Sequence, residues 1–229
     1  MDKKYCFIIS AMRSGSTLLK ALIATRPDCS DFPETPFADY NIVESDKRII
    51  VLKKPPGFEN IEYPELPAIE AKKIILIRNP HDTVRSLKQV FISRNKTDSV
   101  FNDKEFLISY WYMVYSNIIK KKIMEDGNSM VVRYEDLITN PKEETSRVFK
   151  FIGTDFPEGT DTYSVPNNYN WEWRKDDGGD VIKTLQVQKS NKEGLIDKEL
   201  VAFIQSDKDI QFVLNYFGYY SNSIPECVI

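Results

Sequence analysis

Apolar runs of strand length alternate along the chain with longer segments in which apolar residues recur at helical spacing. The apolar runs are rich in β-branched residues and predict strands that are buried on both faces, over residues 5–10, 48–52, 73–77 and 129–133. Helical periodicity predicts helices over residues 16–25, 80–94, 103–125, 141–152 and 197–216. This alternation is typical of an α/β fold in three layers, with a central, mainly parallel sheet of about 4–5 strands and helices on both faces.

Two of the predicted helices have clear start signals. Pro80 and Pro141 stand where a proline in the first helical turn loses no hydrogen bond, and Asn79 and Asn140 before them are favourable N-caps. In the segment 103–125, Trp111 lies on an apolar stripe at helical spacing, so we expect its aromatic residues to pack in the core rather than to bind a cofactor.

The stretch 154–194 has no such pattern. It is rich in Pro, Asn, Gly and Asp, with interspersed aromatic residues that include Trp171 and Trp173. We expect an irregular lid or acceptor loop within one domain that spans residues 1–229, because long irregular loops in compact domains are usually functional. The two tryptophans could stack on an acceptor or anchor the loop to the core.

Composition narrows the function classes. Lys and Arg number 31 against 34 Asp and Glu, which gives a net charge of -3 and argues against general nucleic-acid binding. Three dispersed cysteines and a single histidine, His81, argue against a zinc cluster and a Ser-His-Asp triad, and no G-x-S-x-G motif is present. The apolar stretch at the N-terminus is short, so we expect a cytoplasmic protein without a membrane anchor.

The most informative segment is IISAMRSGSTLL, residues 8–19, where a buried strand turns through a short polar loop into a helix. The first amides of a helix and its dipole favour an anion, Gly15 permits a tight turn, and Arg13, Ser16 and Thr17 add donors. Compared with a P-loop, however, Ser16 replaces the lysine, and the later strand 73–77 ends in Arg78 where a Walker-B aspartate would stand. The loop therefore predicts a phosphate-like ligand without a metal.

The second segment is IRNPHDTVRS, residues 77–86, which places Arg78 at the carboxyl end of a strand and Ser86 two turns into the next helix. Ligands of open parallel sheets bind at this edge, so the two side chains can hold a second phosphate. Taken alone, Arg78 would more often form a surface salt bridge.

Together, MRSGSTLL and LIRNPHDTVRS resemble the two cofactor signatures of the sulfotransferase superfamily, which uses 3′-phosphoadenosine 5′-phosphosulfate (PAPS) and releases 3′-phosphoadenosine 5′-phosphate (PAP). The resemblance implies a P-loop-like fold. It implies that the loop residues hold the 5′-phosphosulfate, namely Arg13, Ser14, Gly15, Ser16 and Thr17. It further implies that Arg78 and Ser86 hold the 3′-phosphate.

Further segments extend the resemblance. Lys53 in VLKKPP is similar to the lysine of the family's K-x-P element, and Glu34 in FPETPF is similar to the catalytic base of tyrosylprotein and related bacterial sulfotransferases. VRYEDL, residues 132–137, resembles a later family element, whereas the R-K-G element has only a loose counterpart at Lys192. Without the family, Glu34 would be interpreted as a solvated loop carboxylate or as a cap of a helix near Pro36, and Lys53 as a snorkelling strand-end side chain.

The resemblance implies in-line transfer of a sulfuryl group from PAPS to a hydroxyl or amine of a small-molecule or saccharide acceptor. Arg13, Lys53 and the loop amides would stabilise charge on the leaving oxygen, and Glu34 would accept the acceptor's proton if burial raises its proton affinity. Two alternatives remain open. One is a magnesium-dependent nucleotide or small-molecule kinase, and the other is a non-catalytic nucleotide-binding protein.

Overall fold

A computed structural model of the protein describes residues 3–60, 62–93, 103–166, 179–189 and 196–219. Its centre is a sheet of four parallel strands in the order β2-β1-β3-β4. The strands are β1 (Lys4–Ile9), β2 (Ile49–Lys53), β3 (Lys72–Ile77) and β4 (Ser129–Arg133). The sequence prediction of an α/β fold with a parallel sheet is confirmed, and every predicted strand end lies within one residue of the observed end.

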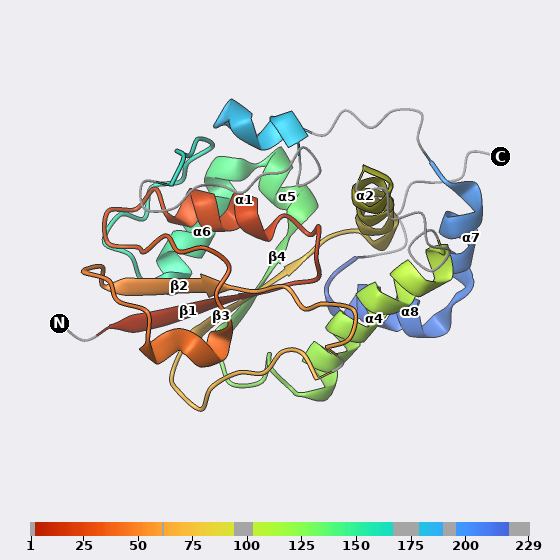
Figure 1. The fold of residues 1–229 in the computed structure, drawn as a ribbon, viewed down its shortest axis with the longest axis horizontal. Coiled ribbons are helices and arrows are strands. Elements are labelled where there is room, and N and C mark those ends of the chain that lie inside the picture. The colour runs from red at the N-terminus through yellow and green to blue at the C-terminus, as the bar shows by residue number, and fades with distance from the viewer. Residues whose placement is uncertain (1–2, 61, 94–102, 167–178, 190–195, 220–229) are drawn as a thin grey trace.

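Helices cover both faces of this sheet (Figure 1). The α-helices are α1 (Ser16–Ile23), α2 (Pro80–Ser93), α4 (Lys104–Lys120), α5 (Tyr134–Thr139), α6 (Pro141–Ile152), α7 (Lys198–Ser206) and α8 (Lys208–Tyr216). Two short 3₁₀ helices are η1 (Phe37–Asn41) and η2 (Gly179–Thr184).

The two faces of the sheet carry separate cores. One joins the strands to α2, α4, α7 and α8, with Trp111 and Tyr115 fully buried in it. The other joins the strands to α1, α5 and α6, with Phe149 at its centre. The prediction that the aromatic residues of the segment 103–125 pack in the core is confirmed.

The helical predictions need four corrections. The segment 197–216 forms two helices, because the Asp207 side chain accepts hydrogen bonds from Asp209 N and Ile210 N and so begins α8. The segment 103–125 stops being helical after Lys120, and α1 ends at Ile23. The short helix α5 was not predicted, since six residues do not show a helical period.

The cap prediction holds for α2 and fails for α6. Asn79 Oδ1 accepts a hydrogen bond from His81 N at 2.9 Å, as an N-cap should. Asn140 stands at the N-cap of α6 but its side chain makes no cap hydrogen bond.

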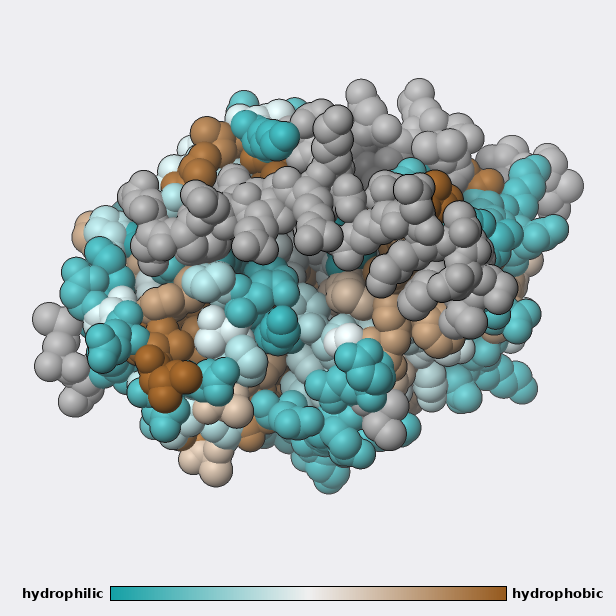
Figure 2. All heavy atoms as spheres, in the orientation of Figure 1, coloured by the Kyte–Doolittle hydropathy of each residue, from teal (hydrophilic) through white to brown (hydrophobic). Residues whose placement is uncertain are grey.

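On the face shown in Figure 2, hydrophilic residues cover most of the coloured surface, and the hydrophobic areas are small and separate. Single exposed apolar side chains are normal on a folded protein. Among the helices that the structure describes, none combines the length and the apolar character that crossing a bilayer requires.

Candidate functional site

The predicted site residues come from the carboxyl ends of three neighbouring strands. β1 leads into the loop before α1, β2 ends at Lys53, and β3 runs into Arg78 just before α2. Because the three strands are parallel and adjacent, these ends lie along one edge of the sheet. The structure therefore brings the two predicted signature segments together.

The loop between β1 and α1 leaves backbone donors exposed to a ligand. Gly15 is the N-cap of α1 with φ 92°, and it accepts the first intrahelical hydrogen bond from Leu19 N at 3.0 Å. The amides of Ser16, Thr17 and Leu18 precede that bond and so have no intrahelical acceptor, and no side chain caps them. Together with the helix dipole, these amides form a site for an anion.

Three buried tyrosine hydroxyls support the preceding part of this loop. They accept hydrogen bonds from three consecutive amides: Ser10 N to Tyr63 at 3.1 Å, Ala11 N to Tyr115 at 3.3 Å and Met12 N to Tyr110 at 2.9 Å. Tyr115 also donates to Leu76 O on β3, and Tyr110 to Pro56 O. Burial raises the pKa of all three phenols, so each stays protonated.

The structure limits what Ser14 can contribute. Its side chain is fully buried, with Oγ 3.0 Å from the Tyr115 hydroxyl. Because the Tyr115 proton is donated to Leu76 O, the Ser14 hydroxyl is the donor of this pair. Only the Ser14 backbone amide can therefore take part in binding a ligand in front of the loop.

Arg78 is the clearest sign of an anionic ligand. The residue is 8% exposed, its Nη1 donates to Arg13 O at 2.8 Å, and its guanidinium lies 4.4 Å from the centre of the Tyr134 ring. Its buried Nε has no hydrogen-bond partner, and no carboxylate of the described residues forms a salt bridge with it. A buried cation without a counter-charge is energetically costly, so a bound anion fits here. The interpretation of Arg78 as a surface salt-bridge residue is wrong.

The Arg13 side chain extends toward α2. Its Nε donates to Ser86 Oγ at 3.1 Å, so Arg13, Arg78 and Ser86 form one group, which we call the arginine group. Arg13 itself has φ 65°, a left-handed conformation that is uncommon for residues other than glycine. The resemblance assigned Arg13 to the phosphosulfate, whereas its side chain lies beside the residues assigned to the 3′-phosphate.

Tyr134, which follows β4, lies between the loop and Arg78. A Cβ built on Gly15 would be 2.4 Å from a carbon of its ring, so only glycine allows this close approach. The sequence analysis named the segment VRYEDL but gave Tyr134 no role. Its position against both Gly15 and Arg78 makes it a wall of the candidate site.

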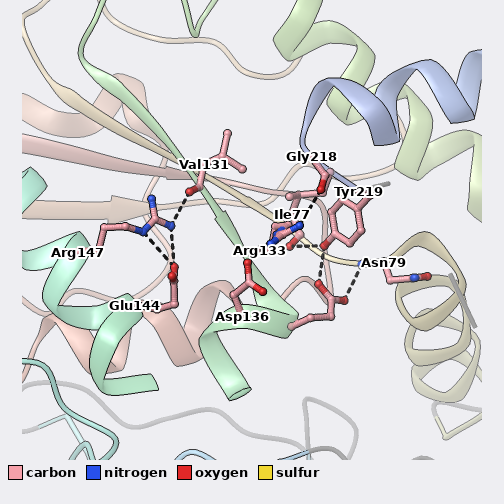
Figure 3. Close-up of polar contacts among 10 residues, drawn as sticks. Ile77, Asn79, Val131, Arg133, Asp136, Glu144, Arg147, Gly218 and Tyr219 are labelled. Carbon is pink, nitrogen blue, oxygen red and sulfur yellow. Dashed lines mark hydrogen bonds and ion pairs between the residues drawn. The ribbon is translucent and has the colours of Figure 1, made fainter. Parts of the chain in front are cut away.

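The turn that carries Arg78 is fixed from the C-terminal part of the chain (Figure 3). Tyr219 donates its one hydroxyl proton to Glu135 Oε2 at 2.5 Å, with Ile77 O a second, weaker acceptor at 3.3 Å, and Glu135 Oε1 accepts from Asn79 N at 2.9 Å. Both neighbours of Arg78 are thus held in place. Glu135 therefore has a structural role here.

Two nearby side chains are also structural. Asp136 pairs with Arg133, whose Nε lies 2.6 Å from Asp136 Oδ2, as Figure 3 shows. His81 is buried, and its Nε2 accepts a hydrogen bond from Asp197 N at 3.1 Å, so that nitrogen carries no proton.

The second group of site residues surrounds Lys53, which is 3% exposed. Lys53 Nζ donates to Thr17 Oγ1 and to Glu34 Oε1, both at 2.7 Å, and Lys54 Nζ lies 3.7 Å from Glu34 Oε2. We call these four residues the lysine group. Lys53 is buried, so its interpretation as a snorkelling side chain is wrong. The N-cap residue of η1 is Pro36, so the interpretation of Glu34 as a helix cap is also wrong.

Glu34 is half-exposed and ionised. Burial raises the pKa of its carboxyl group, but the charge and hydrogen bond of Lys53, with Lys54 and Lys20 beyond it, outweigh this effect and leave the pKa below its ordinary value. The raised proton affinity on which the base role was conditional is therefore not present while Lys53 contacts Glu34.

Some predicted residues lie outside the part of the chain that the structure describes, namely Lys192, Trp171 and Trp173. Other residues of the site had no sequence signal that assigned them to it. In the sequence, Tyr63, Tyr110 and Tyr115 look like ordinary core aromatic residues. Their hydrogen-bond partners in the loop are 53 to 104 residues away along the chain.

Comparison with known proteins gives a match to a family profile. The sequence profile described as "Sulfotransferase domain" matches residues 3–167, which is more than half of the chain. No curated protein matches.

Solved structures share the fold. The sulfotransferase domain of the olefin synthase of Synechococcus PCC 7002 has a TM-score of 0.60 and 17% identity, over 96% of each chain. A sulfotransferase from Alicyclobacillus acidocaldarius has a TM-score of 0.58 and 13% identity, over 99% of this chain and 100% of that one. Mouse sulfotransferase SULT7A1, solved in complex with PAP, has a TM-score of 0.54 and 16% identity, over 94% and 90% of the two chains.

Proposed function

Because this chain belongs to the sulfotransferase family, and its chemistry is sulfuryl transfer, we propose that PAPS is the donor and that the acceptor is a hydroxyl or amine of a small molecule or saccharide. The observation that carries the choice of donor is Arg78, a buried guanidinium without a carboxylate partner among the described residues. Such a group favours a ligand with a phosphate away from the helix N-terminus, as the 3′-phosphate of PAPS is. A fold relative solved with PAP agrees with this choice.

The residues present fit the donor at two places. Arg78, Ser86 and the Arg13 side chain offer guanidinium and hydroxyl donors for the 3′-phosphate. The amides of Ser14, Gly15, Ser16 and Thr17 and the Thr17 hydroxyl offer donors for the 5′-phosphosulfate. When bound, PAPS supplies an activated sulfuryl group whose bond to a phosphate oxygen breaks during transfer.

Lys53 and Glu34 are the proposed catalytic residues beside this donor. Lys53 Nζ already contacts Thr17 Oγ1 at the start of α1, so it is placed to stabilise the negative charge that develops on the leaving oxygen. Glu34 is ionised and half-exposed, so it can accept a proton from an acceptor. Any anion that draws Lys53 away from Glu34 removes an interaction that lowers the pKa of the carboxyl group, and Glu34 then becomes a stronger base.

The proposal also includes the acceptor side. The stretch 154–194 remains a proposed lid or acceptor loop, and Lys192 a proposed further contact to the 3′-phosphate. Both lie wholly or partly outside the described residues.

Calorimetry with PAP, ADP and ATP with Mg²⁺ tests the donor assignment. We expect the parent protein to prefer PAP, and we expect Arg78→Ala to lose about 10- to 100-fold in PAP affinity, since hydrogen bonds to charged groups contribute about 1.5–3 kcal/mol. Arg147→Ala is a matched control, because Arg147 pairs with Glu144 on α6 and should leave PAP binding unchanged.

Other outcomes would contradict the proposal in different ways. Preference for ATP with Mg²⁺ and indifference to the 3′-phosphate would indicate a kinase. Binding of PAP without transfer from PAPS to any member of an acceptor panel would indicate a non-catalytic nucleotide-binding protein.

A further inference from the structure

A buried lysine lies next to the lysine group. Lys20 is on α1, one turn after Thr17, and only 2% of its side chain is exposed. Its Nζ lies 2.9 Å from Asp31 Oδ1 and also donates to Phe32 O. Burying an ammonium group is costly unless it is paired, and an apolar residue of similar size would fill the same space without that cost. The charge therefore calls for an explanation beyond packing.

The partners of Lys20 are at the start of the segment that carries Glu34. Asp31 and Phe32 precede Glu34 by three and two residues, so Lys20 fastens this side of the segment to α1. On the other side, Thr35 N donates to Lys53 O at 3.0 Å and fastens the segment to β2. Glu34 thus lies between two anchors, one on each neighbouring element.

Lys20 also contributes charge at this place. The charged groups that act on Glu34 are Lys53 and Lys54 at the end of β2 and Lys20 from α1, and all three lower the pKa of the carboxyl group. Burial lowers the pKa of Lys20 itself, and Asp31 opposes that shift. Loss of Lys20 would therefore act on Glu34 in two ways, through its position and through its charge.

We propose that Lys20 is a positioning residue of the sulfuryl-transfer site, which holds Glu34 against Lys53 through Asp31 and Phe32. The inference rests on the proposed role of Glu34 as the base. It adds a residue one turn after Thr17 on α1, to which the proposed function gives no contact with donor or acceptor, and which still sets the geometry of the base.

A second ion pair of the same segment provides a matched control. Arg48 Nη2 lies 2.6 Å from Asp28 Oδ2, at the end of the segment that is distant from Glu34. Lys20→Met and Arg48→Met each remove the cation of a largely buried pair, so both should lower the melting temperature. Only Lys20→Met should affect Glu34.

The test is a ¹³C NMR titration of the Glu34 carboxyl group, assigned with Glu34→Gln, together with PAPS turnover. We expect Lys20→Met to raise the pKa of Glu34 toward the ordinary range of glutamate and to lower turnover about 10- to 100-fold, the cost of a small displacement of a reacting group. Lys20→Arg should give a Glu34 pKa and a turnover close to those of the parent, and Arg48→Met should leave the Glu34 pKa and the turnover at parent values. Should Lys20→Met fail to fold, Lys20→Gln removes the charge with little change in volume and is expected to give the same two changes.

Two results would overturn the inference: parent values of both quantities without the Lys20 charge, or equal changes in Arg48→Met. Failure of the proposed function looks different. A parent protein that neither binds PAP nor turns over PAPS contradicts the function, whereas the NMR titration still decides whether Lys20 sets the state of Glu34.

Discussion

The two groups of the site differ in how their charges are balanced before any ligand binds. In the lysine group, Lys53 already has a carboxylate partner, Glu34, at 2.7 Å. In the arginine group, Arg78 is buried without a carboxylate among the described residues. The arginine group can therefore bind an anion without giving up an internal carboxylate, whereas Lys53 must exchange Glu34 for an external anion. In the proposed function the arginine group therefore binds the 3′-phosphate, and the lysine group supplies the catalytic residues.

The largest expected effect comes from a substitution that removes the proposed base and leaves the charges of the arginine group unchanged. Glu34→Gln should lower PAPS turnover by about 10²- to 10⁴-fold, the usual contribution of general-base catalysis. PAP affinity, measured by calorimetry, should stay within about threefold of the parent value, because the Arg78 contacts are unchanged. Parent-like turnover would exclude Glu34 as the base.

A slightly smaller effect on turnover should distinguish Lys53 from the adjacent Lys54. Lys53→Met should lower turnover by about 10²- to 10³-fold, because a buried donor to the developing negative charge is lost. Lys54→Met is the control: Lys54 is half-exposed and 3.7 Å from Glu34, so turnover should change by less than about fivefold. Equal losses in the two variants would contradict the special position of Lys53. Steady-state kinetics with the acceptor that the parent protein uses provides the measurement.

The next effect concerns the tyrosine hydroxyls that hold the loop between β1 and α1. Tyr115→Phe leaves the Ala11 amide and the Leu76 carbonyl without their partner, so the free energy of unfolding should fall by about 1–3 kcal/mol. Denaturant unfolding measures this loss. Tyr112→Phe on the same helix is a control with an expected change below about 0.5 kcal/mol, because Tyr112 is not among the tyrosines that hold the loop. A Tyr115→Phe protein as stable as the parent would show that the loop does not need this hydroxyl.

The smallest effect is a dependence of stability on pH that comes from the lysine group. The pKa of Glu34 is below its ordinary value in the folded protein, so its ion pair contributes stability above the ordinary glutamate pKa, about 4.3. This contribution is lost as the pH falls through the lowered pKa. Glu34→Gln should therefore show a shallower fall of melting temperature between about pH 5 and pH 3 than the parent. Identical slopes would contradict a lowered pKa.

The sheet could be predicted from the sequence because its signal is local. Each buried strand is a run rich in β-branched residues. The bounds of β4, 129–133, were predicted without error, and those of the other three strands differ from the prediction by at most one residue. The position of the β1–α1 loop and Arg78 at one edge of the sheet also followed from pattern, since parallel strands place their carboxyl ends together. The hydrogen bond from the Arg13 side chain to Ser86 did not, because the resemblance placed Arg13 at the other phosphate.

The rest of the site depends on contacts that a linear pattern does not contain. The hydroxyl of Tyr115 finds its amide partner 104 residues away, and Tyr110 finds its partner 98 residues away. The pairing of Lys20 with Asp31 depends on how α1 packs beside the segment that precedes β2. Periodicity identifies such residues as buried, but it does not tell which polar atom meets which.

The contact of Tyr219 with the Arg78 turn has a consequence for synthesis of the protein. A ribosome makes the chain from its N-terminus at about 5–20 residues per second, so both signature segments emerge long before residue 219. Until then the turn lacks the phenol that bonds Ile77 O and Glu135. The nascent chain therefore cannot complete the hydrogen bonds around the Arg78 turn before residue 219 has been added.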